Sequence, residues 1–148
     1  MHDRTFLQFR SGPETYGLPA ERVVQIIRIV AVTPVPNSAP ELLGLVNMRG
    51  QVLPVFDLNR ALHGVDRPIS LRMYVVITEV DGEPLGIVVD DVLDVVTVPE
   101  EQFQSSRALS ADAPFSDGVA RIGAQILTVL NLSPLIDGRP RLGLPVPT

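Results

Sequence analysis

The sequence predicts an all-β fold made of two similar halves, with short helical turns between some of the strands. Three observations support this prediction. Runs rich in valine, isoleucine and leucine are separated by glycine, proline and aspartate throughout the 148 residues, which is typical of strands joined by turns. Two segments of the first half each have a counterpart in the second half, in the same order. No stretch shows the sustained helical periodicity of a bundle.

The first internal repeat aligns residues 44–58 with residues 118–132 without a gap. Both copies start with glycine, share a glutamine followed by an alternating apolar run, and end with leucine. Each copy has the pattern of two strands around a tight turn. Only the first copy has Arg49-Gly50 at that turn, so we expect the halves to share a fold and to differ in surface chemistry.

The second internal repeat aligns residues 16–27 with residues 85–96. A spacing of about seventy residues is too long for a solenoid repeat, so we expect one domain over residues 1–148. Subdomain 1 is expected at about residues 14–70 and subdomain 2 at about 71–132. The N-terminal strand and the C-terminal segment are expected to pack across their boundary.

The first half should contain strands wherever β-branched and aromatic residues dominate. Ser11-Gly12-Pro13 separates the first two strands, and Pro19 marks the start of one helical turn. The prolines between residues 33 and 40 make that stretch a loop, and Gly64 ends a short helix. In chain order we expect strands at 5–10 and 15–18, a turn at 19–22, a strand at 23–32, the strand pair within 44–58 and a helix at 58–63.

The second half starts with the longest strand-like run of the chain, and Asp81-Gly82 is a strong hairpin signal. Residues 100–114 are polar and lack clear periodicity, so we interpret them as a connecting loop. The prolines after Ile136 predict a frayed end. In chain order we expect strands at 70–80, 84–89 and 92–98, followed by the strand pair within 119–132.

Composition excludes several classes of protein. The chain has no cysteine, which excludes disulfides and thiolate metal sites. Met1-His2-Asp3-Arg4 does not begin a signal peptide, and no run approaches the roughly 20 apolar residues of a membrane span, so no direct membrane insertion is expected. The net charge of −5 argues against a nucleic-acid-binding surface, which needs a basic field.

No constellation of residues points to catalysis. His2 and His63 lie outside any catalytic motif, and no nucleophile elbow surrounds Ser105. The acidic cluster around Asp90 and Asp94 does not have the spacing of a calcium loop, and its alternation with valines fits the solvated face of a strand. We therefore expect no enzymatic activity, no metal and no cofactor.

Arg49 is a candidate functional residue because its side chain should project from a turn. A functional arginine would pair bidentately with a carboxylate of its own chain or of a partner; the alternative is a generic hairpin arginine. Val23, Ile26, Val92 and Val95 occupy comparable places in the two halves. They belong either to the core or to a groove between the halves.

Five short motifs are distributed from Phe6 to about Ile136. They are Phe6-Leu7-Gln8-Phe9, Tyr16-Gly17-Leu18, Asn47-Met48-Arg49-Gly50-x-Val52-x-Pro54-Val55-x-Asp57-Leu58, Gly86-Ile87-Val88-Val89-Asp90 and Gly118-Val119. Together they resemble the CheW family, the coupling proteins of bacterial chemosensory systems. The long central motif is highly specific in this context.

The resemblance implies two SH3-like five-stranded β-barrel subdomains around a shared core and no enzymatic activity. It implies a cytoplasmic scaffold at membrane-associated chemoreceptor arrays. The partners would be a CheA-type histidine kinase and the cytoplasmic tips of chemoreceptors, the methyl-accepting chemotaxis proteins. One subdomain would bind the regulatory domain of the kinase, and a groove between the subdomains would bind the helical tip of the receptor.

By resemblance, Arg49 matches the functionally important arginine of the family, and the four apolar residues above match receptor-groove positions. Gln25 stands where relatives often have a glutamate able to pair with that arginine, and it supplies no charge. The loop 104–114 also departs from the family pattern, so no kinase-binding residues are assigned. An alternative function is a small β-barrel module that binds a ligand or nucleic acid. The aromatic content of 5% and the acidic charge weigh against nucleic acid.

Overall fold

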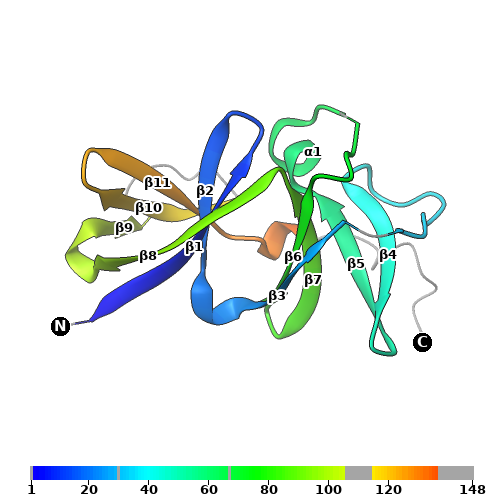
Figure 1. The fold of residues 1–148 in the computed structure, drawn as a ribbon, viewed down its shortest axis with the longest axis horizontal. Helices are drawn as coiled ribbons and strands as arrows, with labels where there is room; N and C mark the ends of the chain where they lie inside the picture. The colour runs from blue at the N-terminus through cyan, green and yellow to red at the C-terminus, as the bar shows by residue number, and fades with distance from the viewer. Residues whose placement is uncertain (1, 30, 67, 106–114, 137–148) are drawn as a thin grey trace.

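The structure is a computed structural model that describes residues 2–29, 31–66, 68–105 and 115–136. Nearly all regular structure in these residues is β-strand (Figure 1). No helix in the described part is long and apolar enough to cross a membrane. In chain order the elements are β1 (Asp3–Ser11), β2 (Glu14–Pro19), the 3-10 turn η1 (Ala20–Arg22), β3 (Val23–Arg28), β4 (Leu42–Met48), β5 (Gln51–Asp57), α1 (Leu58–His63), β6 (Tyr74–Val80), β7 (Glu83–Val89), β8 (Asp91–Pro99), η2 (Glu100–Gln102), β9 (Phe103–Ser105), β10 (Ser116–Ile122), β11 (Gln125–Leu130) and η4 (Ser133–Leu135).

The strands form two sheets that lie side by side (Figure 1). Sheet A has the order β8-β1-β2-β11-β10-β9, and sheet B has the order β3-β6-β7-β5-β4. The chain passes from sheet A to sheet B after β2 and returns after β7. The predicted all-β architecture of two similar halves is therefore confirmed, although sheet A has six strands rather than five.

Each sheet contains one hairpin from the other half of the chain. The β1–β2 hairpin of the first half of the chain pairs with β8 and β11 of the second half, while the β6–β7 hairpin of the second half pairs with β3 and β5 of the first half. The parallel strand pairs of the two sheets have equivalent registers. Gly17 pairs with Val129 in parallel, and Gly86 pairs with Val55 in the same way. The sheets thus divide the chain differently from residues 14–70 and 71–132, a subdomain division that stays a prediction.

A buried core is shared by both sheets. The largest cluster combines Phe9 and Leu18 of sheet A with Phe56 and Ile87 of sheet B, and Leu135 of η4 closes it. Each sheet also encloses a smaller cluster of its own. Because one continuous core joins the two sheets, they form one folding unit.

Two glycines at equivalent places in the first repeat allow close backbone approach. Gly44 and Gly118 have φ angles of 154° and 156°, and each lies at a register shift in its hairpin. A Cβ at Gly44 would lie 2.2 Å from the carbonyl oxygen of Thr33, and one at Gly118 would lie 2.3 Å from that of Gln104. Both positions therefore require glycine for a steric reason as well as a conformational one.

Most predicted elements are confirmed, and the structure corrects the boundaries of others. Helix α1 ends at Gly64, which has a φ of 70° and donates to the Arg60 carbonyl. Strand β3 ends at Arg28 and not at residue 32, and β6 begins at Tyr74 and not at residue 70. The predicted frayed end after Ile136 lies outside the described residues.

The predicted loop at residues 100–114 is wrong in its first part. Residues 100–105 form η2 and β9, and β9 pairs with β10. Phe103 of β9 stacks on Phe6 at a centroid distance of 6.1 Å, and the Arg4 guanidinium lies 3.9 Å from the Phe103 ring centroid. These contacts are distant in sequence, so local composition could not predict the strand. Residues 106–114 lie outside the described part.

We predict that Gly44→Ala lowers the free energy of unfolding by more than about 2 kcal/mol, because the new Cβ would collide with backbone. Gly50→Ala is the matched control, since Gly50 also has a positive φ of 81° but nothing lies within 4 Å of a Cβ there. Its loss should be roughly 1 kcal/mol. Urea unfolding of both variants measures the difference, and equal losses would show that steric collision is not the cause.

Candidate functional site

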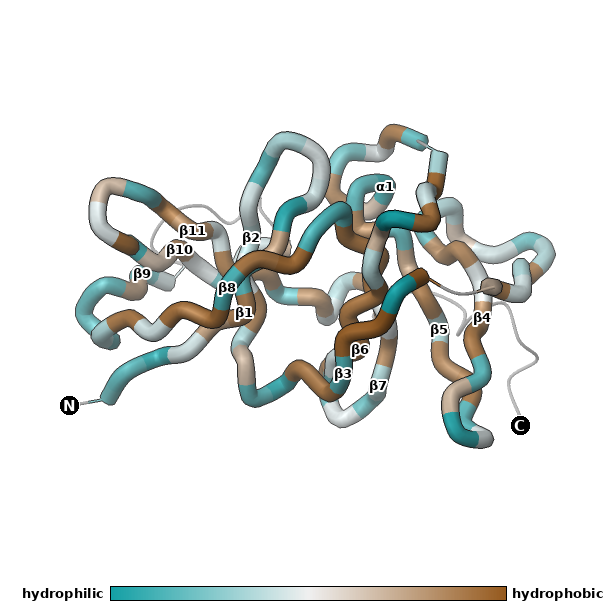
Figure 2. Tube along the Cα trace, in the orientation of Figure 1, coloured by the Kyte–Doolittle hydropathy of each residue, from teal (hydrophilic) through white to brown (hydrophobic). Residues whose placement is uncertain are grey.

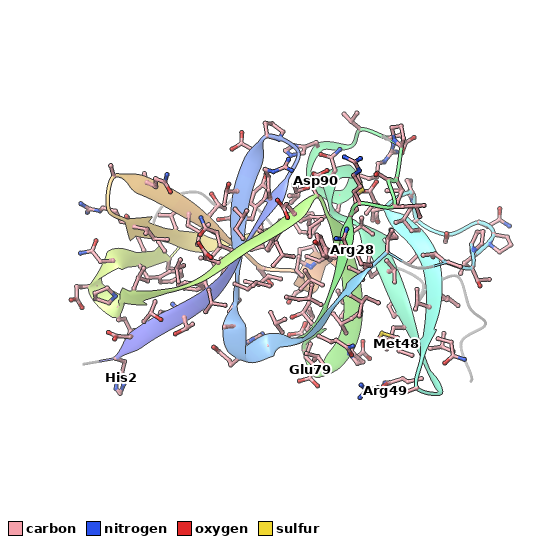
Figure 3. All side chains as sticks on the ribbon, in the orientation of Figure 1. His2, Arg28, Met48, Arg49, Glu79 and Asp90 are labelled. Carbon is pink, nitrogen blue, oxygen red and sulfur yellow. The ribbon has the colours of Figure 1, made fainter. Side chains whose placement is uncertain are left out.

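The β4–β5 hairpin presents Arg49 at its tip. Arg49 and Gly50 have φ angles of 53° and 81°, as a type I′ turn requires. The Asn47 side-chain oxygen accepts a hydrogen bond from the Gly50 N–H at 3.1 Å, which stabilises the turn locally. The Arg49 side chain is exposed and lies at the outer end of the hairpin (Figure 3). A short turn of this type gives the cation a well-defined place on the surface.

Arg49 has no hydrogen bond or ion pair with another residue in the described ranges. Gln25 lies on β3, half-buried, and pairs in register with Ile77. Its neutral amide cannot form an ion pair with Arg49. Glu79 of β6 lies at the same end of the molecule as Arg49 (Figure 3), and both side chains are exposed. The guanidinium is therefore available to a carboxylate outside the described chain.

Two edge strands carry exposed apolar side chains. The exposed fractions are 59% for Val24 and 39% for Ile26 on β3, and 42% for Leu93 and 61% for Val95 on β8. We call these four residues the paired patch, because the second internal repeat aligns Val24 with Leu93 and Ile26 with Val95. Figure 2 shows apolar stretches along both strands. Equivalent exposed apolar residues on two sheet edges are unusual for a surface without a partner.

A register shift lies beside each half of the paired patch. On β3, Val23 pairs with Thr78 and Gln25 with Ile77, so Val24 is an extra residue. On β8, the shift against β1 lies between the partners of Leu7 and Phe9, beside Leu93 and Asp94. The exposed residues of each half lie two positions apart, Val24 with Ile26 and Leu93 with Val95, so strand alternation places each pair on one face.

Of the four apolar residues predicted for either the core or the groove, two pack against the core and two are exposed. Val23 and Val92 are half-buried and pack against the shared core, which favours the core alternative for these two. Ile26 and Val95 are exposed, as a contact surface requires. Val24 and Leu93 were missed, although strand alternation from Ile26 indicates Val24. A receptor-binding role for any of these residues stays a prediction.

The acidic residues near the patch have local structural roles. The Asp90 carboxylate accepts a hydrogen bond from the Gly12 N–H at 2.5 Å, and the Asp91 carboxylate accepts one from the Val92 N–H at 2.9 Å. Within the described ranges, no group of three or more histidine, cysteine or acidic residues is placed to hold a metal ion. The cluster thus supports the turns between the sheets.

One titratable group beside the shared core is perturbed. Burial raises the pKa of the Tyr16 phenol above its usual 10.0, and the negative charge of Glu14 raises it further. The Tyr16 hydroxyl lies 3.5 Å from Nε2 of the exposed His63. A raised phenol pKa moves this group away from the near-neutral range that suits acid–base catalysis.

Comparison with known proteins gives a family match for the sequence and a structural match for the fold. A sequence model described as the CheW-like domain matches residues 5–139, which is most of the chain. The chain belongs to the CheW-like family. The predicted resemblance is thereby confirmed, and it extends over both sheets and η4.

Named relatives of this CheW-like chain come from several bacteria. The probable chemotaxis protein CheW of Rhizobium etli is 29% identical, covering 90% of this chain and 87% of the relative. Chemotaxis protein CheW of Rhizobium meliloti is 26% identical, covering 93% and 90%. Protein FrzA of Myxococcus xanthus is 32% identical, covering 66% and 61%.

The fold also matches a solved structure. The crystal structure of the scaffolding protein TtCheW from Thermoanaerobacter tengcongensis superposes with a TM-score of 0.86 and 24% identity. The match covers 95% of this chain and 97% of that one. At this identity the comparison concerns the fold, and it confirms the predicted pair of SH3-like subdomains.

We predict that Arg49→Ala changes the free energy of unfolding by about 0.5 kcal/mol or less, because an exposed side chain with no described partner contributes little. The melting temperature should stay within a few degrees of that of the unaltered protein. Thermal unfolding followed by circular dichroism measures this. Loss of the folded state would mean that Arg49 supports the hairpin itself.

Proposed function

We propose that this CheW-like protein is a non-catalytic scaffold that couples chemoreceptors to a CheA-type histidine kinase. The observation that carries the proposal is the paired patch on two sheet edges, together with an exposed Arg49 that has no partner among the described residues. The printed names of the relatives, chemotaxis protein CheW among them, support a role in chemotaxis. The structural neighbour is itself named a scaffolding protein.

The paired patch suits a helical partner. Four exposed aliphatic side chains in two pairs match the alternate anchors of an amphipathic helix, which binds by laying its apolar face into a groove. Burying an exposed aliphatic side chain completely contributes about 1.5–3 kcal/mol, and these residues are already partly covered. The patch therefore supplies moderate affinity, in keeping with a helical receptor tip as its partner.

Arg49 supplies orientation. An exposed ion pair contributes only about 0–1 kcal/mol, so one arginine adds little affinity. A guanidinium binds a carboxylate with two parallel hydrogen bonds, and such a contact determines which way a helix lies. We infer that Arg49 selects a receptor tip that carries an acidic residue on the face toward sheet B.

The kinase would bind elsewhere on the protein, on subdomain 1. The paired patch and Arg49 are assigned to the receptor, so a scaffold needs a second surface free for the kinase. We further infer that the protein works in the cytoplasm, at membrane-associated receptor arrays. Its contact residues for the kinase are not assigned.

We predict that Val95→Glu abolishes receptor binding and leaves kinase binding intact. A carboxylate in the patch would lose its hydration when a helix covers it, and that penalty is several kcal/mol per ion. Titration of the purified variant against a receptor fragment and against the kinase regulatory domain, separately, measures both affinities.

Leu71→Glu is the matched control for Val95→Glu. Leu71 is 85% exposed in the segment before β6, so this variant adds the same charge outside the patch. It should bind both partners as the unaltered protein does. If Val95→Glu lost both interactions while circular dichroism showed it folded, the two binding surfaces would not be distinct.

We predict that Arg49→Ala weakens receptor-dependent control of the kinase although the variant is folded. Arg49→Lys should restore only part of the effect, because an ammonium cannot make the bidentate contact. Arg121→Ala removes an exposed arginine of β10, away from the Arg49 turn, and should have no effect. Kinase activity in reconstituted receptor complexes is the measurement, and normal coupling by Arg49→Ala would refute the role of this residue.

A further inference from the structure

Arg28 ends strand β3 on the same face as the apolar residues of the paired patch. Side chains alternate along this strand, so Val24, Ile26 and Arg28 are exposed while the residues between them are half-buried. Consecutive exposed residues of a strand lie roughly 7 Å apart. A cation therefore continues the apolar line of this half of the patch. Figure 3 shows Arg28 well apart from Arg49, so the two arginines mark different parts of sheet B.

The Arg28 side chain is held over an aromatic ring. Tyr74 is its partner in the β3–β6 register, and Cζ of Arg28 lies 4.6 Å from the centroid of the Tyr74 ring. Nη1 of Arg28 also donates a long hydrogen bond of 3.4 Å to the Arg72 carbonyl oxygen. Tyr74 is half-buried and packs against the shared core, so the ring is a firm support. A cation this close to a ring face is attracted by the ring quadrupole, and this restricts the direction of the guanidinium.

Most hydrogen-bond donors of Arg28 remain available to a partner. A guanidinium has five N–H groups, and stacking on a ring leaves those in its plane able to bind an acceptor. Strand β3 has no acidic residue of its own. Within the described ranges, Arg28 forms no ion pair. The side chain is therefore an arginine with a restricted direction that can accept a carboxylate from another molecule.

The β8 half of the paired patch lacks this feature. Continued by one residue, the second internal repeat aligns Arg28 with Thr97. The hydroxyl of Thr97 is hydrogen-bonded to that of Thr5 at 3.1 Å. The exposed charged residue between the two patch residues of β8 is Asp94. The two halves thus have similar apolar residues and charges of opposite sign, which allows a partner to distinguish them.

We propose that Arg28 binds a carboxylate of the receptor helix, one helical turn from the apolar residue that contacts Ile26. This inference rests on the proposed function and adds a second acidic position in the partner. The separation of roughly 7 Å between Ile26 and Arg28 is close to one helical turn, so residues i and i+4 of a helix can reach both. Because Tyr74 already holds the guanidinium, little side-chain entropy is lost on binding. The acidic residue lies over β3, since the negative charge of Asp94 disfavours it over β8.

A double-mutant cycle with a soluble fragment of the receptor tip tests this contact. Arg28→Gln in the full chain is titrated against the unaltered fragment. It is then titrated against fragments in which each acidic residue is changed, one at a time, to the corresponding amide. Arg72→Gln is the matched control, because Arg72 is a neighbouring exposed arginine that stacks on no ring among the described residues. Circular dichroism verifies that both variants are folded.

Arg28→Gln should weaken binding of the receptor fragment roughly three- to tenfold, with no further loss against one of the amide-substituted fragments. Arg28→Lys should recover only part of that loss, because an ammonium cannot make the bidentate contact. Arg72→Gln should weaken binding less than about twofold, because it changes only the general field of the surface. Affinity for the kinase regulatory domain should be the same in all three variants.

Two results would overturn this inference alone. One is receptor binding that Arg28→Gln does not weaken, or weakens no more than Arg72→Gln does. The other is a loss on Arg28→Gln that persists in full against every amide-substituted fragment, because no carboxylate of the receptor would then be its partner. Failure of the unaltered chain to bind the fragment would overturn the proposed scaffold function, and this inference with it.

Discussion

In each sheet, one parallel strand pair joins the two halves of the chain, and the arrangement of both sheets depends on this pairing. It occurs at Gly17 with Val129 and at Gly86 with Val55. A Cβ at Gly17 would lie 2.8 Å from Cδ2 of Leu127, and one at Gly86 would lie 2.7 Å from Cγ1 of Val75. Glycine therefore permits the close packing of both sheets at their centres, and the remaining strands are arranged around these contacts.

The exchange of hairpins also places the paired patch on sheet edges. The chain leaves sheet A after β2 and sheet B after β7. The strands that follow, β3 and β8, are edge strands of sheet B and sheet A. Edge strands have unpaired backbone N–H and C=O groups that can pair with a strand of another chain. The bulges at Val24 and beside Leu93 interrupt the regular ladder, so these edges are poor templates for another strand. Their exposed side chains remain available to a helix.

Small differences distinguish the surfaces of the two similar halves. Both hairpins of the first repeat have the same bulge glycine and an exposed β-branched residue, Val52 or Ile126. Arg49 occurs in one of these hairpins only, and Leu135 of η4 lines a pocket beside β5 and β7. A duplicated fold can thus present different surfaces while both halves keep the same arrangement of strands.

The sequence by itself determined the elements that depend on local backbone preferences. These include the turn at Arg49-Gly50, the hairpin at Asp81-Gly82 and the helix that ends at Gly64, because each depends on residues that tolerate a positive φ. The internal repeats also established that the two halves are alike. Arg49 was recognised as exposed for the same local reason.

The tertiary structure alone decided which strands share a sheet. Exchanged and unexchanged hairpins present the same apolar faces to a core, so the alternation along each strand cannot distinguish them. The three-residue strand β9 likewise depends on distant contacts with β10, Phe6 and Arg4. Val23 and Val92 pack against the shared core, so their neighbours Val24 and Leu93 lie on the exposed faces of β3 and β8, and only the pairing of the strands decides which face is covered. Register belongs to a pair of strands, and one strand read alone does not contain it.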